Sequence, residues 1–271
     1  MNTCQAFRAL HERNELFVMP NAWCEGSARL IQQMGYASIG TTSAGIAYAK
    51  GYRDSSPSMD NEDRFAAIDR IVRAVDIPVT ADLENGLAKT LEQVEEHFRR
   101  ALSIGCAGAS IEDISDYSDP NTPLYFPIAE ACDRVRAASG AVHALDADFI
   151  VTARTDYLLG ANEYSLNEVV ARLVAFEEAG ADCLFAPGVR SIEDLEVIRR
   201  SLTKPLSVIP VSGMTIDRLR TIGIRRISLG SSLFRAAYRQ ISTVLLQLEN
   251  PDGLDFLKSG LSLSQLDDVM R

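Results

Sequence analysis

The sequence predicts an α/β fold, a closed (β/α)8 TIM barrel with an N-terminal helix and an extra C-terminal helical tail. Short apolar runs alternate with longer amphipathic stretches throughout the 271 residues, and short connections join them. Eight such units in this length indicate a closed barrel. We expect residues 1–247 to form the barrel and 248–271 the tail. A doubly wound open sheet is the alternative, but no G-x-G-x-x-G follows the first strand.

Hydrophobic periodicity places the individual elements. We expect strands near 16–20, 36–40, 77–82, 107–111, 149–153, 182–185, 206–209 and 226–229. We expect helices over 3–12, 22–34, 61–74, 90–103, 127–139, 163–178, 191–200, 215–222 and 231–247. Asn21 is a suitable N-cap for the second helix, and Gly35 suits its C-terminal end. A long polar loop is expected after the second strand, reaching Asp54.

The composition excludes several classes of partner. The formal net charge is -10, which argues against binding to nucleic acid or to an anionic membrane. No apolar run is long enough to span a bilayer. The five cysteines are scattered and form no C-x-x-C motif, which indicates a reducing compartment. We therefore expect a cytoplasmic protein that acts on a small molecule.

Two carboxylates end the third predicted strand. The run from Ile77 is apolar and β-branched, and it leads directly to Asp82 and Glu84. Side chains two residues apart on a strand point the same way, so both acids should face one point. Two crowded carboxylates repel each other, and a hard cation relieves that repulsion. Mg²⁺, held by one or two carboxylates and water, suits such a site. A solvated acidic turn is the alternative interpretation.

Polar residues also follow the other early strands. In a (β/α)8 barrel the carboxyl ends of the strands meet at one mouth, where active sites lie. Acids at the ends of two neighbouring strands, faced by an arginine, are stronger evidence for a site than one acid pair. The residues concerned are Asn21 and Trp23, Thr42 and Ser43, Asp82 and Glu84, Glu112 and Asp113, and Arg154 and Asp156.

Six segments of the chain resemble the isocitrate lyase / phosphoenolpyruvate mutase superfamily in order and spacing. They are Thr42–Ala47, Gly51–Asp54, Ala81–Gly86, Gly108–Asp113, Thr152–Asp156 and Gly223–Gly230. The resemblance extends over essentially the whole chain. It implies a modified (β/α)8 barrel that binds a 2-oxo acid or its enolate on Mg²⁺, with Mn²⁺ as a possible substitute.

The resemblance also implies a metal site. Asp82 would ligate the ion directly or through water, and Glu84, Glu112 and Asp54 would support the water shell. Glu84 stands where many relatives have a second aspartate. Mg²⁺ would act as a Lewis acid on the developing oxyanion, and such stabilisation is worth several kcal/mol.

For the substrate, the resemblance implies that the loop of Thr42, Ser43 and Ala44 binds a carboxylate through hydroxyl and backbone amides. Arg154 would pair with the substrate oxygens, since its planar fork matches a carboxylate. Arg154, together with Asp54 and Glu112, is therefore expected to be catalytic. A surface arginine at a strand end is the alternative for Arg154.

The segment 114–127 departs from the family pattern. Isocitrate and methylisocitrate lyases carry a Lys-(Lys/Arg)-Cys-Gly-His motif there, and phosphonomutases keep a lysine and an asparagine. This chain has no Lys, Cys or His in the segment, and Asn121 is out of register. We expect decarboxylation of an oxaloacetate-like acid, which needs neither the thiol nor the lysine. A P–C bond enzyme, a methylisocitrate lyase-like enzyme and a non-catalytic small-acid-binding barrel are the alternatives.

Leucines recur at helical spacing after the barrel, at Leu254, Leu257, Leu261 and Leu266. A completed barrel has no core left to receive them. Relatives pass such a terminal helix to a neighbouring subunit, so the resemblance implies a homo-oligomer, a dimer of dimers. A tail folded on its own barrel is the alternative.

Overall fold

The computed structural model describes residues 2–117, 123–159, 165–250, 253–258 and 260–271. One sheet of nine parallel strands forms its centre, in the order β1-β11-β10-β9-β8-β5-β4-β3-β2. The strands are β1 (Phe17–Met19), β2 (Asn21–Ala22), β3 (Ile39–Thr41), β4 (Val79–Asp82), β5 (Gly108–Glu112), β8 (Ile150–Arg154), β9 (Cys183–Phe185), β10 (Leu206–Val208) and β11 (Arg226–Ser228).

The sheet closes through a broken first strand. β1 pairs with β11 and β2 pairs with β3, and only Pro20 separates the two. Proline has no N–H to donate, which explains the break in the ladder. The Pro20 carbonyl still accepts from the Gly40 amide at 3.0 Å. β1 and β2 therefore act as one position among eight, and the predicted (β/α)8 barrel is confirmed.

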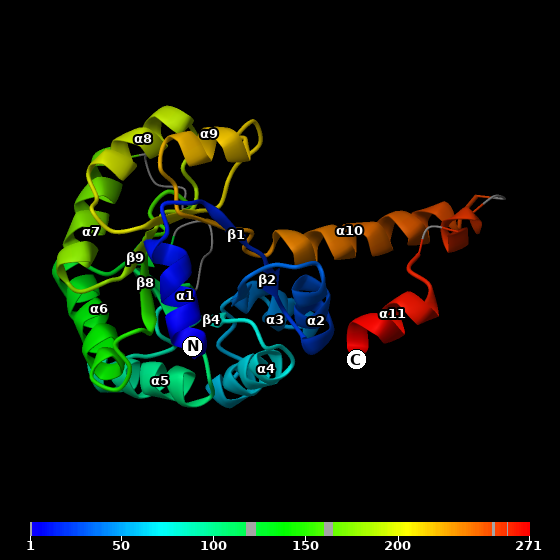
Figure 1. Ribbon diagram of the computed structural model, residues 1–271, viewed down its shortest axis with the longest axis horizontal. Coiled ribbons are helices and arrows are strands. Elements are labelled where there is room, and N and C mark those ends of the chain that lie inside the picture. Colours follow the sequence, from blue (N-terminus) through cyan, green and yellow to red (C-terminus); the bar gives the residue numbers. More distant parts are fainter. Residues whose placement is uncertain (1, 118–122, 160–164, 251–252, 259) are drawn as a thin grey trace.

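Helices surround this sheet (Figure 1). α2 to α9 lie outside the strands, and α1 lies across one open end of the barrel. Phe7 of α1 is fully buried there. The helices are α1 (Thr3–Glu12), α2 (Glu25–Gln33), α3 (Ser43–Ala49), α4 (Asn61–Arg73), α5 (Leu91–Ser103), α6 (Ile128–His143), α7 (Leu166–Glu178), α8 (Ile192–Arg200), α9 (Ile216–Thr221), α10 (Ser232–Gln247) and α11 (Leu263–Met270), with a 3₁₀ turn at Asp255–Lys258.

Several local predictions were wrong. Asn21 does not cap α2, because Cys24 holds that position. Asn21 instead lies in β2 and connects the strands on either side of the break at Pro20. Its Nδ2 donates to the Thr41 carbonyl of β3 at 2.9 Å, and its Oδ1 accepts from the Ser228 hydroxyl of β11 at 3.1 Å. The expected loop after the second strand contains α3. A hairpin of β6 (Ile114–Asp116) and β7 (Leu124–Tyr125) occupies part of the 114–127 segment, while Asn121 lies outside the described residues.

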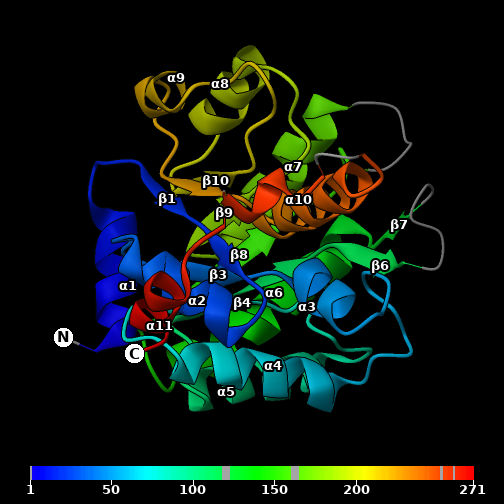
Figure 2. The same cartoon turned by 90° about the vertical axis from the view of Figure 1, so that its right-hand side faces the viewer.

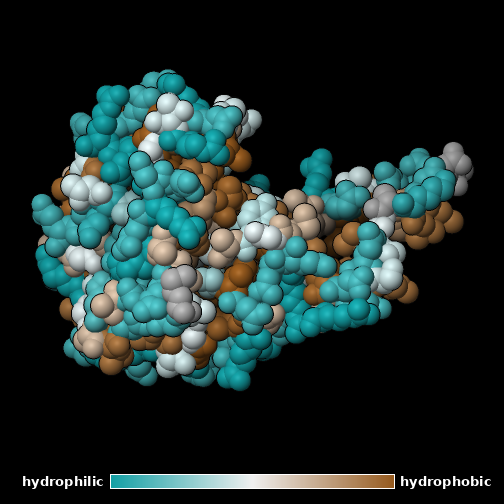
Figure 3. All heavy atoms as spheres, viewed as in Figure 1, coloured by the Kyte–Doolittle hydropathy of each residue, from teal (hydrophilic) through white to brown (hydrophobic). Residues whose placement is uncertain are grey.

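α10 and the 3₁₀ turn at Asp255–Lys258 project from the barrel as an arm (Figures 1 and 2). α11 returns toward α2, where the Met270 carbonyl accepts a hydrogen bond from Arg29. Hydrophobic side chains gather along the arm (Figure 3), and Leu245, Leu246 and Leu263 are exposed by 60%, 64% and 80%. No helix in the part of the chain that the structure describes is long and apolar enough to cross a membrane.

Candidate active site

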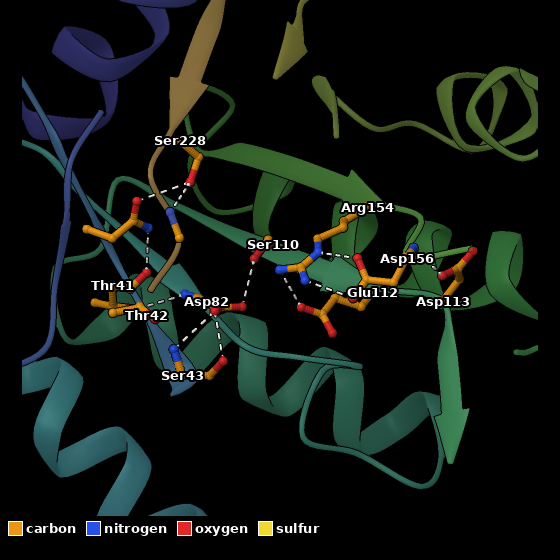
Figure 4. A network of polar contacts seen from close by, with 12 residues as sticks. Thr41, Thr42, Ser43, Asp82, Ser110, Glu112, Asp113, Arg154, Asp156 and Ser228 are labelled. Carbon is orange, nitrogen blue, oxygen red and sulfur yellow. Dashed lines mark hydrogen bonds and ion pairs between the residues drawn. The ribbon is translucent and has the colours of Figure 1, made fainter. Parts of the chain in front are cut away.

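Strand register brings the predicted polar residues together at the carboxyl ends of β4, β5 and β8 (Figure 4). Asp82, the last residue of β4, is the direct partner of Ser110 on β5. Glu112, the last residue of β5, is the direct partner of Arg154, the last residue of β8. Parallel strands end at the same face of a barrel, so residues far apart in sequence meet there.

Arg154 lies between two carboxylates. Its Nη1 is 2.7 Å from Glu112 Oε1, and its Nε and Nη2 contact the two oxygens of Asp156 at 2.5 and 2.8 Å. The two contacts with Asp156 are hydrogen bonds and use two of the five guanidinium N–H donors, whereas the contact with Glu112 is an ion pair. Burial would lower the pKa of Arg154, but the charges of Asp156 and Glu112 outweigh it and raise the pKa well above its usual value. Arg154 therefore stays charged and is held in one orientation.

Asp113 stabilises the position of Asp156, the main partner of Arg154. It is 1% exposed, its Oδ1 accepts from the Asp156 amide at 3.0 Å, and its Oδ2 lies 3.2 Å from Arg172 Nη1. Burial raises the pKa of Asp113 to about 6. Asp113 holds the backbone of Asp156, and Asp156 in turn forms two hydrogen bonds with Arg154. Asp113 therefore positions the arginine without contacting it.

Asp82 is bound by Ser43, the first residue of α3. The Ser43 amide and hydroxyl donate to Asp82 Oδ2 at 3.1 and 2.9 Å, and Ser110 Oγ lies 3.4 Å from Oδ1. The predicted substrate loop is thus a helix start. Thr42 is its N-cap and accepts from the Gly45 amide at 3.2 Å, and Ala44 is buried in the first turn.

Glu84 does not follow the strand geometry used to predict it. β4 ends at Asp82, and Glu84 has a left-handed φ of 51° in the turn beyond. The Glu84 carboxylate is buried and forms an ion pair with Arg64 of α4. Burial raises the pKa of Glu84 to about 7, with the Arg64 charge opposing and the Asp82 charge adding to the rise. The two acids are electrostatic neighbours through a turn rather than through strand alternation.

The charge of Asp82 acts on four other acids at this end of the barrel. It adds to the effect of burial in raising the pKa of Asp54, Glu84, Glu112 and Asp156. The side chain of Asp54 is the most solvent-accessible of these four acids. Crowded carboxylates with raised pKa values favour binding of a cation, because it stabilises their ionised forms.

The donor set suits a water-rich magnesium site. Among the described residues, no three His, Cys, Asp or Glu side chains form a ready-made metal cage. Mg²⁺ is held by one or two carboxylates and keeps several waters, whereas structural zinc takes four protein ligands. Asp82, only partly buried and surrounded by acids, fits the first description.

Sequence reasoning missed Tyr117. Its hydroxyl donates to Glu112 Oε2 at 2.6 Å, so Glu112 is held by Tyr117 on one oxygen and by Arg154 on the other. Burial and the Glu112 charge raise the pKa of Tyr117 well above its usual value. Tyr117 lies in the segment 114–127, which contains none of the Lys, Cys and His residues that are typical of lyase or mutase chemistry. An aromatic hydroxyl five residues after a mouth carboxylate was the signal in the sequence.

A cavity joins these groups to the barrel interior. Asp82, Ser110, Arg154, Ser228 and Arg226 are among its lining residues. An acidic mouth, one oriented guanidinium and nearby hydroxyls can hold a metal ion and a small carboxylic acid together.

The profile of the phosphoenolpyruvate phosphomutase family matches residues 7–248 of this sequence. The chain belongs to this family. It is an enzyme of the phosphoenolpyruvate mutase/isocitrate lyase superfamily, and the resemblance seen in its motifs is confirmed.

Individual proteins and solved structures are also similar to this chain. The oxaloacetate decarboxylase of Pseudomonas putida is 27% identical over 241 residues, covering 86% of this chain and 80% of that protein. A Burkholderia cenocepacia structure described as a lyase/mutase is 33% identical, covers 98% of this chain and 94% of that one, and has a TM-score of 0.91. A phosphonopyruvate hydrolase in complex with oxalate and Mg²⁺ has the same fold, at 22% identity, 99% and 95% coverage and a TM-score of 0.86.

Proposed function

We propose that the protein is a Mg²⁺-dependent carbon–carbon lyase that decarboxylates an oxaloacetate-like 2-oxo acid. The observation that carries the proposal is Arg154, fixed between Glu112 and Asp156 beside the acids around Asp82. The similarity to oxaloacetate decarboxylases supports the same reaction class. When bound, Mg²⁺ supplies Lewis acidity to the 2-oxo oxygen, with Mn²⁺ as a possible substitute.

The chain's own residues would divide the remaining work. Asp82 holds the ion, and Glu84, Glu112 and Asp54 order its water shell. Arg154 has N–H donors beyond its two hydrogen bonds to Asp156, and these can bind a substrate carboxylate.

The first turn of α3 holds the same substrate group in this proposal. Thr42, Ser43 and Ala44 form that turn, and Ser43 already contacts Asp82. A carboxylate bound at this turn would lie next to the metal ligand. Loss of CO₂ from carbon 4 of oxaloacetate leaves the pyruvate enolate, which then takes a proton at carbon 3.

The 114–117 segment favours this reaction over lyase chemistry that needs a thiol. Its described residues bring Tyr117 to Glu112 and supply no cysteine, lysine or histidine. Tyr117 can orient Glu112 and exclude water from the arginine pair. Proton transfer to an enolate can use water, so decarboxylation requires no further acid of matched pKa.

Product assays for pyruvate, 2-oxobutyrate, glyoxylate and phosphoenolpyruvate test the proposal. Oxaloacetate, methyl-oxaloacetate, isocitrate, methylisocitrate and phosphonopyruvate are each supplied with Mg²⁺, and free Mg²⁺ without protein gives the background. We expect pyruvate from oxaloacetate well above that background and none after EDTA treatment. Turnover of methylisocitrate or phosphonopyruvate alone would replace the proposal with the corresponding lyase or P–C bond activity. Absence of turnover on all five would favour an acid-binding barrel.

We also propose a cytoplasmic homo-oligomer, a dimer of dimers. All five cysteines are free, which suits a reducing compartment. The exposed leucines of α10 and the following segment suit a subunit contact, because a monomer would leave them in water. α11 already contacts α2 of its own chain, so the covered surface would lie mainly along α10.

A further inference from the structure

A second cavity, of about 450 Å³, lies at the opposite end of the barrel from the candidate active site. It is lined where strands begin: Ile150 opens β8, Asp182 precedes β9, and Arg225 precedes β11. α1, which crosses this end of the barrel in Figure 1, forms another wall. The volume is within the range of small-molecule sites.

Cations dominate this cavity, although the whole chain is acidic. Arg8, Arg199, Lys204 and Arg225 line it, and we call these four residues the basic groove. The acids of its lining are Glu12 and Asp182. A cleft lined mainly by one sign of charge concentrates its field and attracts small ions of the opposite sign.

Asp182 is already neutralised by other partners. One of its oxygens lies 3.0 Å from Arg8 Nη2, and the other lies 2.9 Å from His143 Nε2 and accepts from the Val151 amide at 2.9 Å. These contacts hold its pKa below the usual value despite burial. Asp182 therefore has little charge left to offset the other cations of the groove.

Arg199 and Arg225 are held by neutral groups. Arg199 donates to the backbone carbonyls of Leu202 and Lys204, both at 2.6 Å. Arg225 donates to the Glu15 carbonyl at 3.2 Å and to Asn14 Oδ1 at 3.1 Å, and its buried Nε has no hydrogen-bond partner among the described residues. Within that same part of the chain, neither guanidinium, nor the ammonium of Lys204, has a carboxylate within 4.0 Å.

The two guanidiniums are close enough to repel each other. Burial lowers the pKa of Arg199, and the Arg225 charge adds to that effect. Glu177 opposes it, but this carboxylate is occupied by the backbone amides of Thr203 and Lys204. Partly buried like charges held together without a counter-charge are costly, and an anion between them would remove that cost.

We propose that the basic groove is a binding site for a small multivalent anion, such as a phosphorylated or polycarboxylate metabolite. Two arginine forks suit planar, bidentate contacts with phosphate or carboxylate oxygens, and the lysine adds a point charge. The site is separate from the catalytic mouth. Ile150 and Arg154 are the two ends of β8, so about 13 Å of strand lies between the cavities.

Isothermal titration at constant ionic strength, with EDTA present, tests this proposal. Pyrophosphate and citrate are the two probes, and their relative affinities distinguish phosphate from carboxylate selectivity. We expect one site per chain for wild type. Lys204→Gln should weaken binding about tenfold, because a charge-assisted contact is lost. Lys204 is exposed and its ammonium contacts no carboxylate among the described residues, so this variant should fold normally.

The controls make the result specific. Lys258→Gln removes the same charge from the C-terminal segment and should bind as wild type does. Asp82→Ala should also retain binding, since it changes only the catalytic end. Arg199→Gln with Arg225→Gln should abolish binding, with circular dichroism to confirm folding. No binding of either probe to wild type at millimolar concentration, equal affinity in Lys204→Gln, or loss in Asp82→Ala would each overturn the proposal.

Discussion

Asp82 accepts two hydrogen bonds from Ser43, one from its amide and one from its hydroxyl. This contact joins the end of β4 to the start of α3, two segments 39 residues apart. The residue predicted to hold a metal and a residue predicted to hold the substrate are therefore one hydrogen-bonded unit. A substitution of Asp82 or of Ser43 should therefore affect both metal binding and substrate binding.

The first prediction concerns this unit. Asp82→Ala should abolish Mg²⁺ or Mn²⁺ binding measured calorimetrically with oxalate present, because it removes the proposed ligand. Ser43→Ala keeps the carboxylate and the backbone amide, so affinity should fall about tenfold, as expected for one lost hydrogen bond. Asp76→Asn, an exposed acid in a turn, is the charge control. Metal affinity in Asp82→Ala equal to that of wild type would refute the assignment.

The second prediction separates the charge of Arg154 from its shape. Arg154→Lys keeps a cation but loses the bidentate contact with Asp156, so kcat/KM should fall roughly 100-fold. Arg154→Met leaves Glu112 and Asp156 buried without their cation. The free energy of unfolding should then fall by about 3–5 kcal/mol in urea denaturation. Equal activity of the lysine variant and wild type would show that the fork has no catalytic role.

The third prediction tests Tyr117. Tyr117→Phe removes the donor that contacts Glu112 Oε2, and this donor lowers the pKa of Glu112. The acid limb of the kcat/KM profile should therefore move to higher pH, and kcat should fall about tenfold. The stability change should stay near 1 kcal/mol. Tyr36→Phe, at an exposed hydroxyl, should change neither; an unshifted acid limb in Tyr117→Phe would contradict the proposed role.

The fourth prediction is a pH dependence of stability without metal. The pKa of Glu84 is about 7 in the folded protein against an ordinary 4.5, so the folded state binds more protons than the unfolded chain between these values. Stability should consequently fall as pH rises through this window, by about 1–3 kcal/mol. Urea unfolding in EDTA at pH 5 and pH 8 measures it.

Two comparisons check that fourth prediction. Glu84→Gln mimics the protonated carboxyl, so its stability should vary less over the same range. Saturating Mg²⁺ should reduce the loss at pH 8, because a ligand that binds only the folded state stabilises it. Stability that rises with pH equally in wild type and Glu84→Gln would show that Glu84 is ionised throughout.

The fifth prediction concerns assembly. Light scattering at micromolar concentration should give about four times the 29.7 kDa chain mass. Ile241→Glu with Leu245→Glu, on the exposed face of α10, should dissociate the assembly because charge cannot be buried in an apolar contact. Arg239→Glu, on the same helix, tests whether any new negative charge has that effect. A wild-type mass of 29.7 kDa would exclude the oligomer.

The sequence by itself determined the barrel and the position of its mouth. Hydrophobic periodicity is a local property, and parallel strands end on one side, so local patterns were enough to assign Asp82, Glu112 and Arg154 to one face. The motifs around them identified the superfamily. The break at Pro20 and the turn at Glu84 lay within elements that were otherwise placed correctly.

Only the tertiary structure decided which side chains are partners. Register aligns Glu112 with Arg154, and the docking of α3 brings Ser43 to Asp82. The basic groove likewise combines α1, the end of α8 and the start of β11, which no sequence window contains. Spacing along a chain fixes the direction of a side chain on its own element. Its partner depends on how distant elements pack, because burial and counter-charge come from across the fold.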